Sequence, residues 1–376
     1  MLIKDEIHGT IGFDALEERI IDSGPFQRLR RIRQMSVTNL VYPGANHTRF
    51  EHSLGTAHLS SVIASRLGLG EDIVRKVKLY GLLHDIGHTA FSHEGEDVVA
   101  EHTGDHEKLG RKRILEGEIA DILSENYKPR EIADMGKSPY GSIISSDIGA
   151  DRMDYLKRDA LNTGVAYGII DTDRIVHTLQ MEKGELCVEK GGLEAAEYLL
   201  IARFMMFSAV YMHHTVRIAT AMLYRAIEGA IGDGTLPPER LGELDDEGAL
   251  MAISKSAEGG PFADALVKRR LFKQVCSFPA QGWTEEVARE AEKMISDEAG
   301  SRVLVDYPHR FFRQVGFQVR TEEGLKPMTE LSTLVQSLKK AEEDRMRVLV
   351  LSDEKTKEEK ENEIASIARR IRPPAR

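Results

Sequence analysis

Hydrophobic residues recur at helical spacing through the first two thirds of the chain. Separate runs predict helices over residues 26–35, 49–67, 143–159 and 198–231, and one more that includes YGLLHDIGH at 80–88. Charged residues interrupt the run at 198–231, whereas a membrane span needs about 20 apolar residues in succession. We therefore expect that run to be a buried core helix.

The pattern changes near residues 232–238, where glycine and proline mark a boundary. Before it, residues 177–194 alternate on either side of a Glu-Lys-Gly turn and predict a β-hairpin. After it, residues 239–300 have an amphipathic helical pattern, and VLVDY, VGFQVR and RVLVLSD predict strands, with a helix near 329–343. The expected fold is mainly α with a small C-terminal α+β lobe, divided into a core (1–235), a helical extension (236–300), the lobe (301–352) and a charged tail (353–376). We expect that tail to be a solvated helix or a frayed end.

Composition makes a soluble globular protein the expected class, because 41% of the 376 residues are hydrophobic and 30% are charged. The N-terminal segment lacks the layout of a secretory signal, so no membrane association is expected. Cys187 and Cys276 are far apart and form neither a disulfide framework nor a cysteine zinc site, which favours a reducing cytoplasm. The net charge of −10 argues against a nucleic-acid partner, and no P-loop sequence occurs.

The adjacent pair His84-Asp85 is the strongest chemical signal. It supplies a neutral nitrogen and an anionic oxygen, which are good ligands for a divalent metal. The pair lies in an apolar run, where an unpartnered carboxylate would be costly. A lone histidine is more often a hydrogen-bonded core residue, but a doublet followed by His88 one turn later favours a metal site.

Two further residues complete a ligand set from separate predicted helices. His52 lies in RFEHSLG and Asp151 lies in DIGADRMDYLKRD. With His84 and Asp85 they give two imidazoles and two carboxylates, which suit Mn, Fe, Ni or Zn and leave positions open for water and a substrate oxygen.

The motifs FQRLRRIRQM, YPGANHTRFEHSLG, LLHDIGHTAFSH, DHEKLG, DRMDYLKRD and VYMHH follow one another between about Asp22 and Ile231. In this order they resemble the HD-domain phosphohydrolase superfamily, and within it the deoxynucleoside triphosphate (dNTP) triphosphohydrolases. The resemblance implies HD helices packed around the metal, a homo-oligomer, and hydrolysis of a dNTP to deoxynucleoside and inorganic triphosphate, with Mg accompanying the triphosphate.

The same resemblance assigns roles to individual residues. His88 and His93 would face the phosphates, with His93 as the proton donor to the leaving 5′-oxygen. His106 would pair with Glu96; a vertebrate member of the family has aspartate at the position of Glu96. Three arginines would contact the triphosphate: Arg49, Arg152 and Arg203. A second group would contact the deoxyribose: Gln34, Tyr155, Asp159 and Tyr211. Asp22 and Arg30 match residues that bind a regulatory guanine nucleotide in the vertebrate relative, which permits such an activator here.

Two other functions remain open from sequence. The chain could be another HD phosphohydrolase, such as a nucleotidase or phosphodiesterase, or a nucleotide-binding regulatory protein with little turnover. The retained ligand set and the three additional histidines argue against the regulatory protein.

Overall fold

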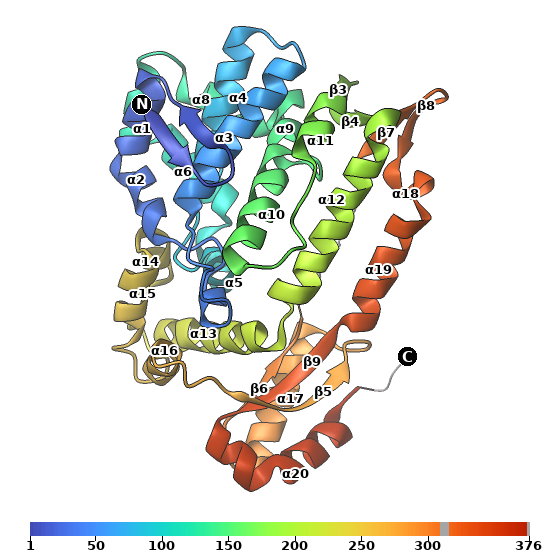
Figure 1. Cartoon of the computed structure of the whole chain (residues 1–376). Helices are drawn as coiled ribbons and strands as arrows, with labels where there is room; N and C mark the ends of the chain where they lie inside the picture. The colour runs from blue at the N-terminus through green and yellow to red at the C-terminus, as the bar shows by residue number, and fades with distance from the viewer. Residues whose placement is uncertain (309–315, 374–376) are drawn as a thin grey trace.

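Helices α3 (Arg49–Arg66) and α4 (Glu71–Leu83) lie along each other at the centre of the helical part of the molecule (Figure 1). The computed structural model describes residues 1–308 and 316–373. The predicted mainly α fold is confirmed. Around this pair lie the other helices of the first half: α1 (Ala15–Asp22), α2 (Gly24–Gln27), α5 (Ser92–Thr103), α6 (His106–Leu115), α7 (Glu118–Ser124), α8 (Pro129–Ala133), α9 (Ser142–Ser145), α10 (Ala150–Thr163) and α11 (Thr172–Thr178).

Local sequence explains how α3 and α4 begin and meet. Thr48 and Glu51 form a capping box that satisfies free backbone N–H groups at the start of α3. The helices approach closely at Gly81, where an added Cβ would lie 2.8 Å from Ser60 Oγ. Helix α4 ends at Leu83. The His84-Asp85 doublet was predicted to lie within this helix, but it lies at the C-terminal end.

Two more predicted helices, over 26–35 and 143–159, are shorter or broken. The helix predicted over 26–35 ends at Gln27 and continues as a 3₁₀ turn, η1 (Arg28–Arg31), because the buried Arg28 donates to the carbonyls of Leu244 and His88. The run 143–159 is divided into α9 and α10 by residues 146–149. Such tertiary contacts override local propensity.

The run 198–231 is not one helix. It comprises α12 (Leu193–Met206), a π turn η6 (Phe207–Tyr211) and α13 (His214–Gly232), because His213 caps a new helix by accepting from the Thr215 N–H. Within residues 1–308 and 316–373, no single helix has the length and apolar content to cross a membrane. The segments 190–211 and 214–232 meet that test only when combined across a 66° bend.

Helix α13 joins the helical part to a C-terminal lobe (Figure 1). In that lobe an antiparallel sheet has the order β5 (Lys273–Pro279), β9 (Arg347–Ser352), β6 (Val303–Asp306). Helices α17 (Glu285–Ala299) and α20 (Glu354–Ile371) pack on it. The lobe therefore begins before the predicted boundary at residue 301 and extends past 352.

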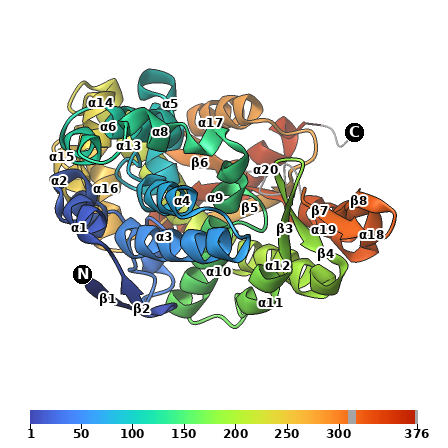
Figure 2. The ribbon, with the colours of Figure 1, turned by 90° about the horizontal axis from the view of Figure 1, so that it is seen from above.

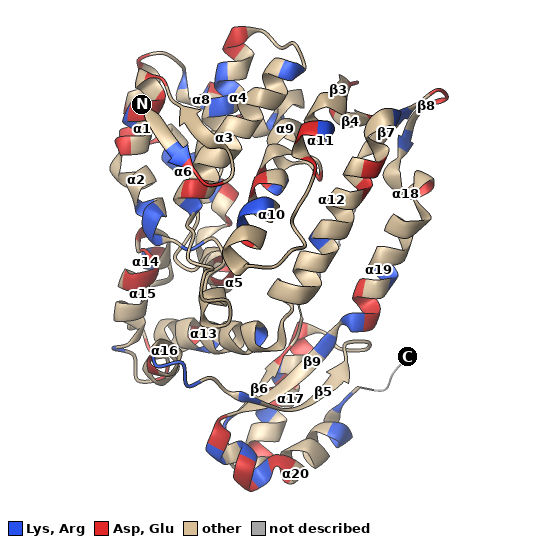
Figure 3. Cartoon of the chain, in the orientation of Figure 1, with Lys and Arg blue, Asp and Glu red and all other residues tan. Residues whose placement is uncertain are grey.

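Two predictions about this part of the chain are wrong. The segment 239–300 is not wholly helical, because β5 pairs with β9, a partner about 70 residues away that no local pattern reveals. Much of the charged tail is packed: α20 buries Ile364, Ile367 and Ala368, while charges of both signs occupy its outer face (Figure 3). Residues 374–376 of that tail lie outside the described residues.

The hairpin predicted over 177–194 is confirmed as β3 (Leu179–Glu182) and β4 (Glu185–Glu189). It forms a second sheet with β7 (Gln318–Thr321) and β8 (Gly324–Pro327), in which β4 and β7 are parallel. The strands predicted at VLVDY and RVLVLSD and the helix near 329–343 are also present; Val315, at the start of VGFQVR, lies outside the described residues. The remaining elements are β1 (Leu2–Asp5), β2 (Gly9–Gly12), α14 (Pro238–Glu243), α15 (Asp246–Ile253), α16 (Gly260–Val267), α18 (Met328–Leu331), α19 (Thr333–Arg345) and the 3₁₀ turns η2 (Thr38–Leu40), η3 (Met135–Lys137), η4 (Pro139–Gly141) and η5 (Lys190–Gly192).

Candidate metal and catalytic centre

The four predicted metal ligands come together from three helices. His52 lies on α3, His84 and Asp85 follow α4, and Asp151 lies in the first turn of α10. The Nε2 atom of His52 is 3.1 Å from Asp151 Oδ1 and 3.7 Å from Asp85 Oδ2. The Nε2 atom of His84 is 3.2 Å from Asp85 Oδ1 and 3.9 Å from Asp151 Oδ1. Both imidazoles therefore aim the same nitrogen at a space between the two carboxylates.

The opposite nitrogen of each ring is already bonded. His52 Nδ1 lies 2.8 Å from Asp154 Oδ2, and His84 Nδ1 lies 2.8 Å from the Gly81 carbonyl oxygen. Both partners are acceptors, so Nδ1 donates a hydrogen in each ring and Nε2 is the nitrogen available to a metal ion. Both Nε2 atoms are buried and have no hydrogen-bond partner among the described residues. This arrangement fits a divalent metal.

Charge around these ligands also favours a cation. Burial alone would lower the pKa of His52, but Asp151 and Asp154 raise it to about 10. Burial likewise opposes ionisation of Asp85, yet the neighbouring Arg49 holds the pKa of this carboxyl well below its usual range. The carboxylates are thus ionised in a nearly dry site, where a positive ion is stabilised.

A second cluster adjoins the first and contains His88, His93, Glu96 and His106, all predicted to be catalytic. The rings of His88 and His106 are stacked with centroids 4.1 Å apart, and the His93 ring stands nearly perpendicular to both. Glu96 reaches His106: its Oε2 is 2.8 Å from Nδ1, and its Oε1 accepts from the backbone N–H. The glutamate side chain therefore reaches His106, as expected, although the vertebrate relative has the shorter aspartate at this position.

The three histidines differ in environment. His88 is fully buried, and burial followed by Arg49 holds its pKa well below the usual value, so the ring is neutral. Burial lowers the pKa of His106, but Glu96 raises it overall. His93 is 63% exposed, and its Nδ1 lies 3.5 Å from Glu96 Oε2. Among these four residues His93 alone lines the neighbouring cavity as the described chain forms it.

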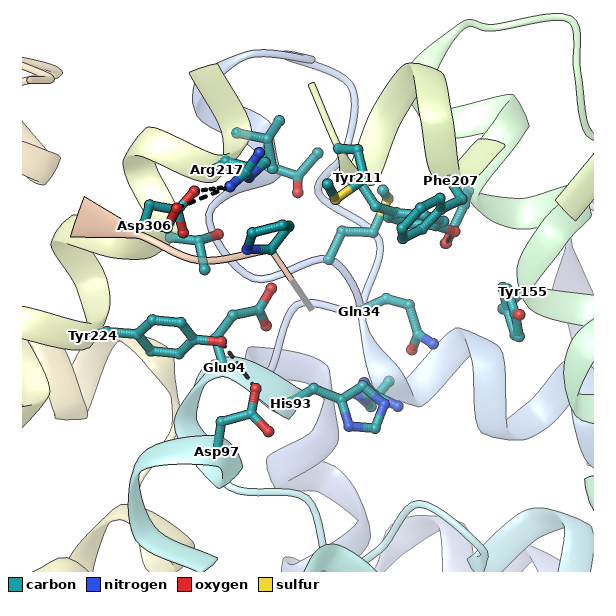
Figure 4. A pocket seen from close by; sticks show the side chains of 18 of the residues that line it. Gln34, His93, Glu94, Asp97, Tyr155, Phe207, Tyr211, Arg217, Tyr224 and Asp306 are labelled. Atoms are coloured by element: carbon teal, nitrogen blue, oxygen red, sulfur yellow. Dashed lines mark hydrogen bonds and ion pairs between the residues drawn. The ribbon is translucent and has the colours of Figure 1, made fainter. Parts of the chain in front are cut away.

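That cavity has a volume of about 450 Å³, within the range of small-molecule sites. It extends from the predicted metal ligand Asp151 past α5 and α13 to β6 of the C-terminal lobe. In Figure 4, Gln34 and His93 lie near its middle, with Tyr155 on one side and Tyr224 on the other.

Two of the three predicted phosphate-binding arginines line this cavity. Arg49 is buried and bonds Asp85 and Ser92, while Arg152 lies next to Asp151. Arg203 is not part of the cavity wall: its Nη1 lies 2.8 Å from the buried Asp147. A contact between Arg203 and the triphosphate therefore stays a prediction.

All four predicted sugar-binding residues line the cavity: Gln34, Tyr155, Asp159 and Tyr211. Tyr211, in the π turn, donates its hydroxyl to Asp159, which also lies 2.7 Å from His47 Nε2. Burial, followed by Asp159, raises the pKa of Tyr211, which keeps the phenol protonated as a donor. Gln34 Oε1 is buried without a partner among the described residues, so it can accept a hydrogen bond from a ligand.

Sequence reasoning missed the residues that support this site: His8, Asp154 and Arg158 behind the ligand His52, and His47 beside Asp159. Asp154 and Arg158 lie in DRMDYLKRD, where spacings of three and seven from Asp151 could have suggested a shared helix face. His47 lies in the quoted motif YPGANHTRFEHSLG, but its type alone gave it no role. Nothing near His8 in sequence indicates that it reaches this site.

The two residues predicted for a regulatory nucleotide are exposed. Asp22 ends α1, and the Arg30 guanidinium lies 3.5 Å from the centroid of the Phe50 ring, with Nε bonded to Gln27. Packing on Phe50 is sufficient to explain the position of Arg30, and a nucleotide site there stays a prediction.

Comparison with known proteins agrees with this geometry. Residues 49–159 match the HD domain and residues 170–370 match the HD associated region. An uncharacterised protein of Methanocaldococcus jannaschii is 38% identical over 96% of this chain and 82% of its own length. The chain belongs to the HD-domain phosphohydrolase superfamily.

Two other proteins are similar to this chain. The crystal structure of a hypothetical protein from Aquifex aeolicus superposes with a TM-score of 0.82 at 31% identity, covering 98% of this chain and 99% of that one. A Dictyostelium discoideum protein named as a homologue of the deoxynucleoside triphosphate triphosphohydrolase SAMHD1 is 26% identical over 78% of this chain and 62% of its own length.

Proposed function

We propose that this phosphohydrolase cleaves a dNTP at the α-phosphate to give deoxynucleoside and inorganic triphosphate. The observation that carries the proposal is the single cavity of about 450 Å³. It places a metal ligand, Asp151, beside Arg49 and Arg152, and continues to Tyr155 and Tyr211. A substrate with several phosphates and a sugar has matching groups along its length.

The donor atoms of His52, His84, Asp85 and Asp151 would hold the metal. When bound, a divalent ion supplies positive charge that polarises the α-phosphoryl group. Arg49 and Arg152 place guanidinium groups next to the same ligands, where their planar forks suit phosphate oxygens.

His93 is suited to donate a proton to the leaving 5′-oxygen. It lies at the cavity wall, and its Nδ1 is 3.5 Å from Glu96 Oε2. The neutral His88 ring, perpendicular to His93, limits the positions that His93 can adopt. His106 Nδ1 lies 2.8 Å from Glu96 Oε2 and fixes that carboxylate.

Other residues of the cavity wall would select the sugar. Gln34 Oε1 would accept from the 3′-hydroxyl, and the Tyr211 ring, held by Asp159, would pack against the deoxyribose. A 2′-hydroxyl would meet that ring, so ribonucleotides are expected to react poorly. A guanine-nucleotide activator and a homo-oligomer remain part of the proposal from family resemblance.

The second histidine cluster favours one alternative. Its ligand atoms also lie within 4.8 Å of one another, and His88 Nε2 is only 3.3 Å from the metal ligand Asp85. If both clusters held ions, the site would suit a two-metal phosphodiesterase or nucleotidase.

The deciding experiment incubates the purified protein with each dNTP and NTP, a nucleoside monophosphate and a cyclic nucleotide. Mn, Fe, Ni and Zn are compared, each with and without Mg and GTP. Anion-exchange chromatography should show triphosphate and deoxynucleoside from dNTPs, with the Asp151→Ala variant as the inactive control. Release of only phosphate or pyrophosphate, or a preference for the monophosphate or cyclic compound, would contradict the proposal.

A further inference from the structure

The N-terminal hairpin, β1 and β2, lies outside both family matches, which begin at residue 49 and residue 170. Asp5 shapes its turn, because its Oδ1 accepts from the backbone N–H groups of Ile7 and His8. This Asx-type turn directs the His8 side chain inward, where it is 8% exposed. Figure 2 shows the hairpin beside α3 and near α10, the two helices that carry His52 and Asp151.

The His8 side chain contacts Asp154, whose buried carboxylate is hydrogen-bonded to the predicted metal ligand His52. Asp154 Oδ1 is 2.7 Å from His8 Nε2 and 2.9 Å from Arg158 Nη2. Asp154 Oδ2 is 2.8 Å from His52 Nδ1 and 3.0 Å from Arg158 Nε. A carboxylate has about four lone-pair sites, so every one is used.

The hairpin also holds the arginine of this network. Arg158 is fully buried, and its Nη1 lies 2.9 Å from Asp5 Oδ2. Asp5 and His8 thus support both members of the Asp154–Arg158 pair from one turn. The pair in turn faces Gly55 on α3, where an added Cβ would be 1.9 Å from Asp154 Oδ1.

We infer that His8 is a positioning residue of the metal centre, acting on His52 through Asp154. Its Nε2–H completes the bonding of Asp154 Oδ1, so that Asp154 Oδ2 stays directed at His52 Nδ1–H. That bond fixes the ring orientation and leaves His52 Nε2 for the metal. The hairpin is therefore part of the metal centre although it supplies no ligand. The inference rests on the metal centre alone, so the identity of the substrate does not affect it.

The test measures metal affinity by isothermal titration of the metal-stripped full chain with Mn²⁺ and Zn²⁺. Loss of an outer hydrogen-bond partner of a ligating histidine typically weakens binding by about 10–100-fold, and we expect His8→Ala to fall in that range. His8→Gln keeps a side-chain N–H donor and should recover most of the affinity. Thr10→Ala changes the exposed side of the same hairpin, where the Thr10 hydroxyl accepts a hydrogen bond from Lys4 Nζ, and should bind as the wild type does.

The Co²⁺ absorption spectrum and the melting temperature of the metal-stripped proteins separate positioning from a general loss of stability. A changed spectrum in His8→Ala, restored in His8→Gln, with similar melting of the two variants, supports the inference. Wild-type affinity in His8→Ala overturns it, as does weakened binding that follows melting temperature and is not recovered by glutamine. Absence of metal binding by the wild type removes the metal centre and this inference with it.

Discussion

The two neighbouring histidine clusters differ in what holds each imidazole ring. We call the first, with His52, His84, Asp85 and Asp151, the ligand cluster. We call the second, with His88, His93, Glu96 and His106, the relay cluster. In the ligand cluster, Asp154 and the Gly81 carbonyl each bind an Nδ1, which leaves two Nε2 atoms directed at one space. In the relay cluster, the rings face one another, and Glu96 binds His106 while lying near His93. The same side chain is thus arranged for a metal in one place and for a proton in the other.

Charge separates the clusters in the same way. The ligand cluster has two carboxylates, with Asp154 as a third behind them. The relay cluster has one carboxylate for three imidazoles, and the histidines hold the pKa of Glu96 far below its usual value despite its burial. We therefore expect a resident cation at the ligand cluster and a mobile proton at the relay cluster.

Removing a ligand should have the largest effect. Asp85→Asn keeps the side-chain shape but removes the anionic oxygen that faces His84 Nε2. We expect loss of the bound metal, measured by mass spectrometry of the dialysed protein. Turnover should fall by about 10³-fold or more, since a metal contributes several kcal/mol of charge stabilisation. Full metal content in this variant would contradict the assignment of the ligand cluster.

Changing His93 should separate chemistry from metal binding. His93→Gln removes the proposed proton donor, and general acid catalysis typically contributes about 10²–10⁴-fold to rate. We expect a loss in kcat within that range, with metal content equal to that of the wild type. A parallel loss of metal would instead support a second ion in the relay cluster.

The sequence indicated the members of both clusters better than the residues that support them. The four residues of the ligand cluster have metal-binding side chains within recognisable motifs, and the structure brings them together, while their role as ligands stays a prediction. The residues behind them were not indicated, since Asp154 looks like any helical acid and His8 lies more than 140 residues from its partner. Long-range hydrogen bonds of this kind leave no local pattern.

The errors in the fold have a similar origin. Helical periodicity over 198–231 is real, but the chain inserts the π turn that brings Tyr211 to Asp159 and then starts α13 at a new angle. A π turn inside a helical run is frequently associated with a functional site. Periodicity indicates which residues are helical, whereas the turns that build the cavity depend on contacts between elements.

Gly55 tests how far the ligand cluster depends on its support. Gly55→Ala introduces a methyl group 1.9 Å from Asp154 Oδ1 and 2.5 Å from Arg158 Nη2. Overpacking of this kind typically costs about 1–3 kcal/mol, so despite the higher helix propensity of alanine we expect lower melting temperature and weaker metal binding. Gly232→Ala is the matched control, because no atom lies within 4 Å of its added Cβ. Equal melting temperatures of the two variants would show that neighbouring groups accommodate the added methyl group at Gly55 without a loss of stability.

The smallest expected effect comes from the pH dependence of the relay cluster. Glu96 raises the pKa of His106, so their pairing contributes stability below the usual histidine pKa near 6.5, which is lost as pH rises through the folded-state value. The lowered pKa of Glu96 means that its own contribution is present above its usual pKa near 4.3. In metal-free buffer, the melting temperature of Glu96→Gln should therefore fall below that of the wild type by about 2 °C near pH 6, as expected for about 1 kcal/mol in a chain of this size, and by less near pH 9. A difference that grows with pH would contradict this pairing, because it would mean that His106 is neutral in the folded protein.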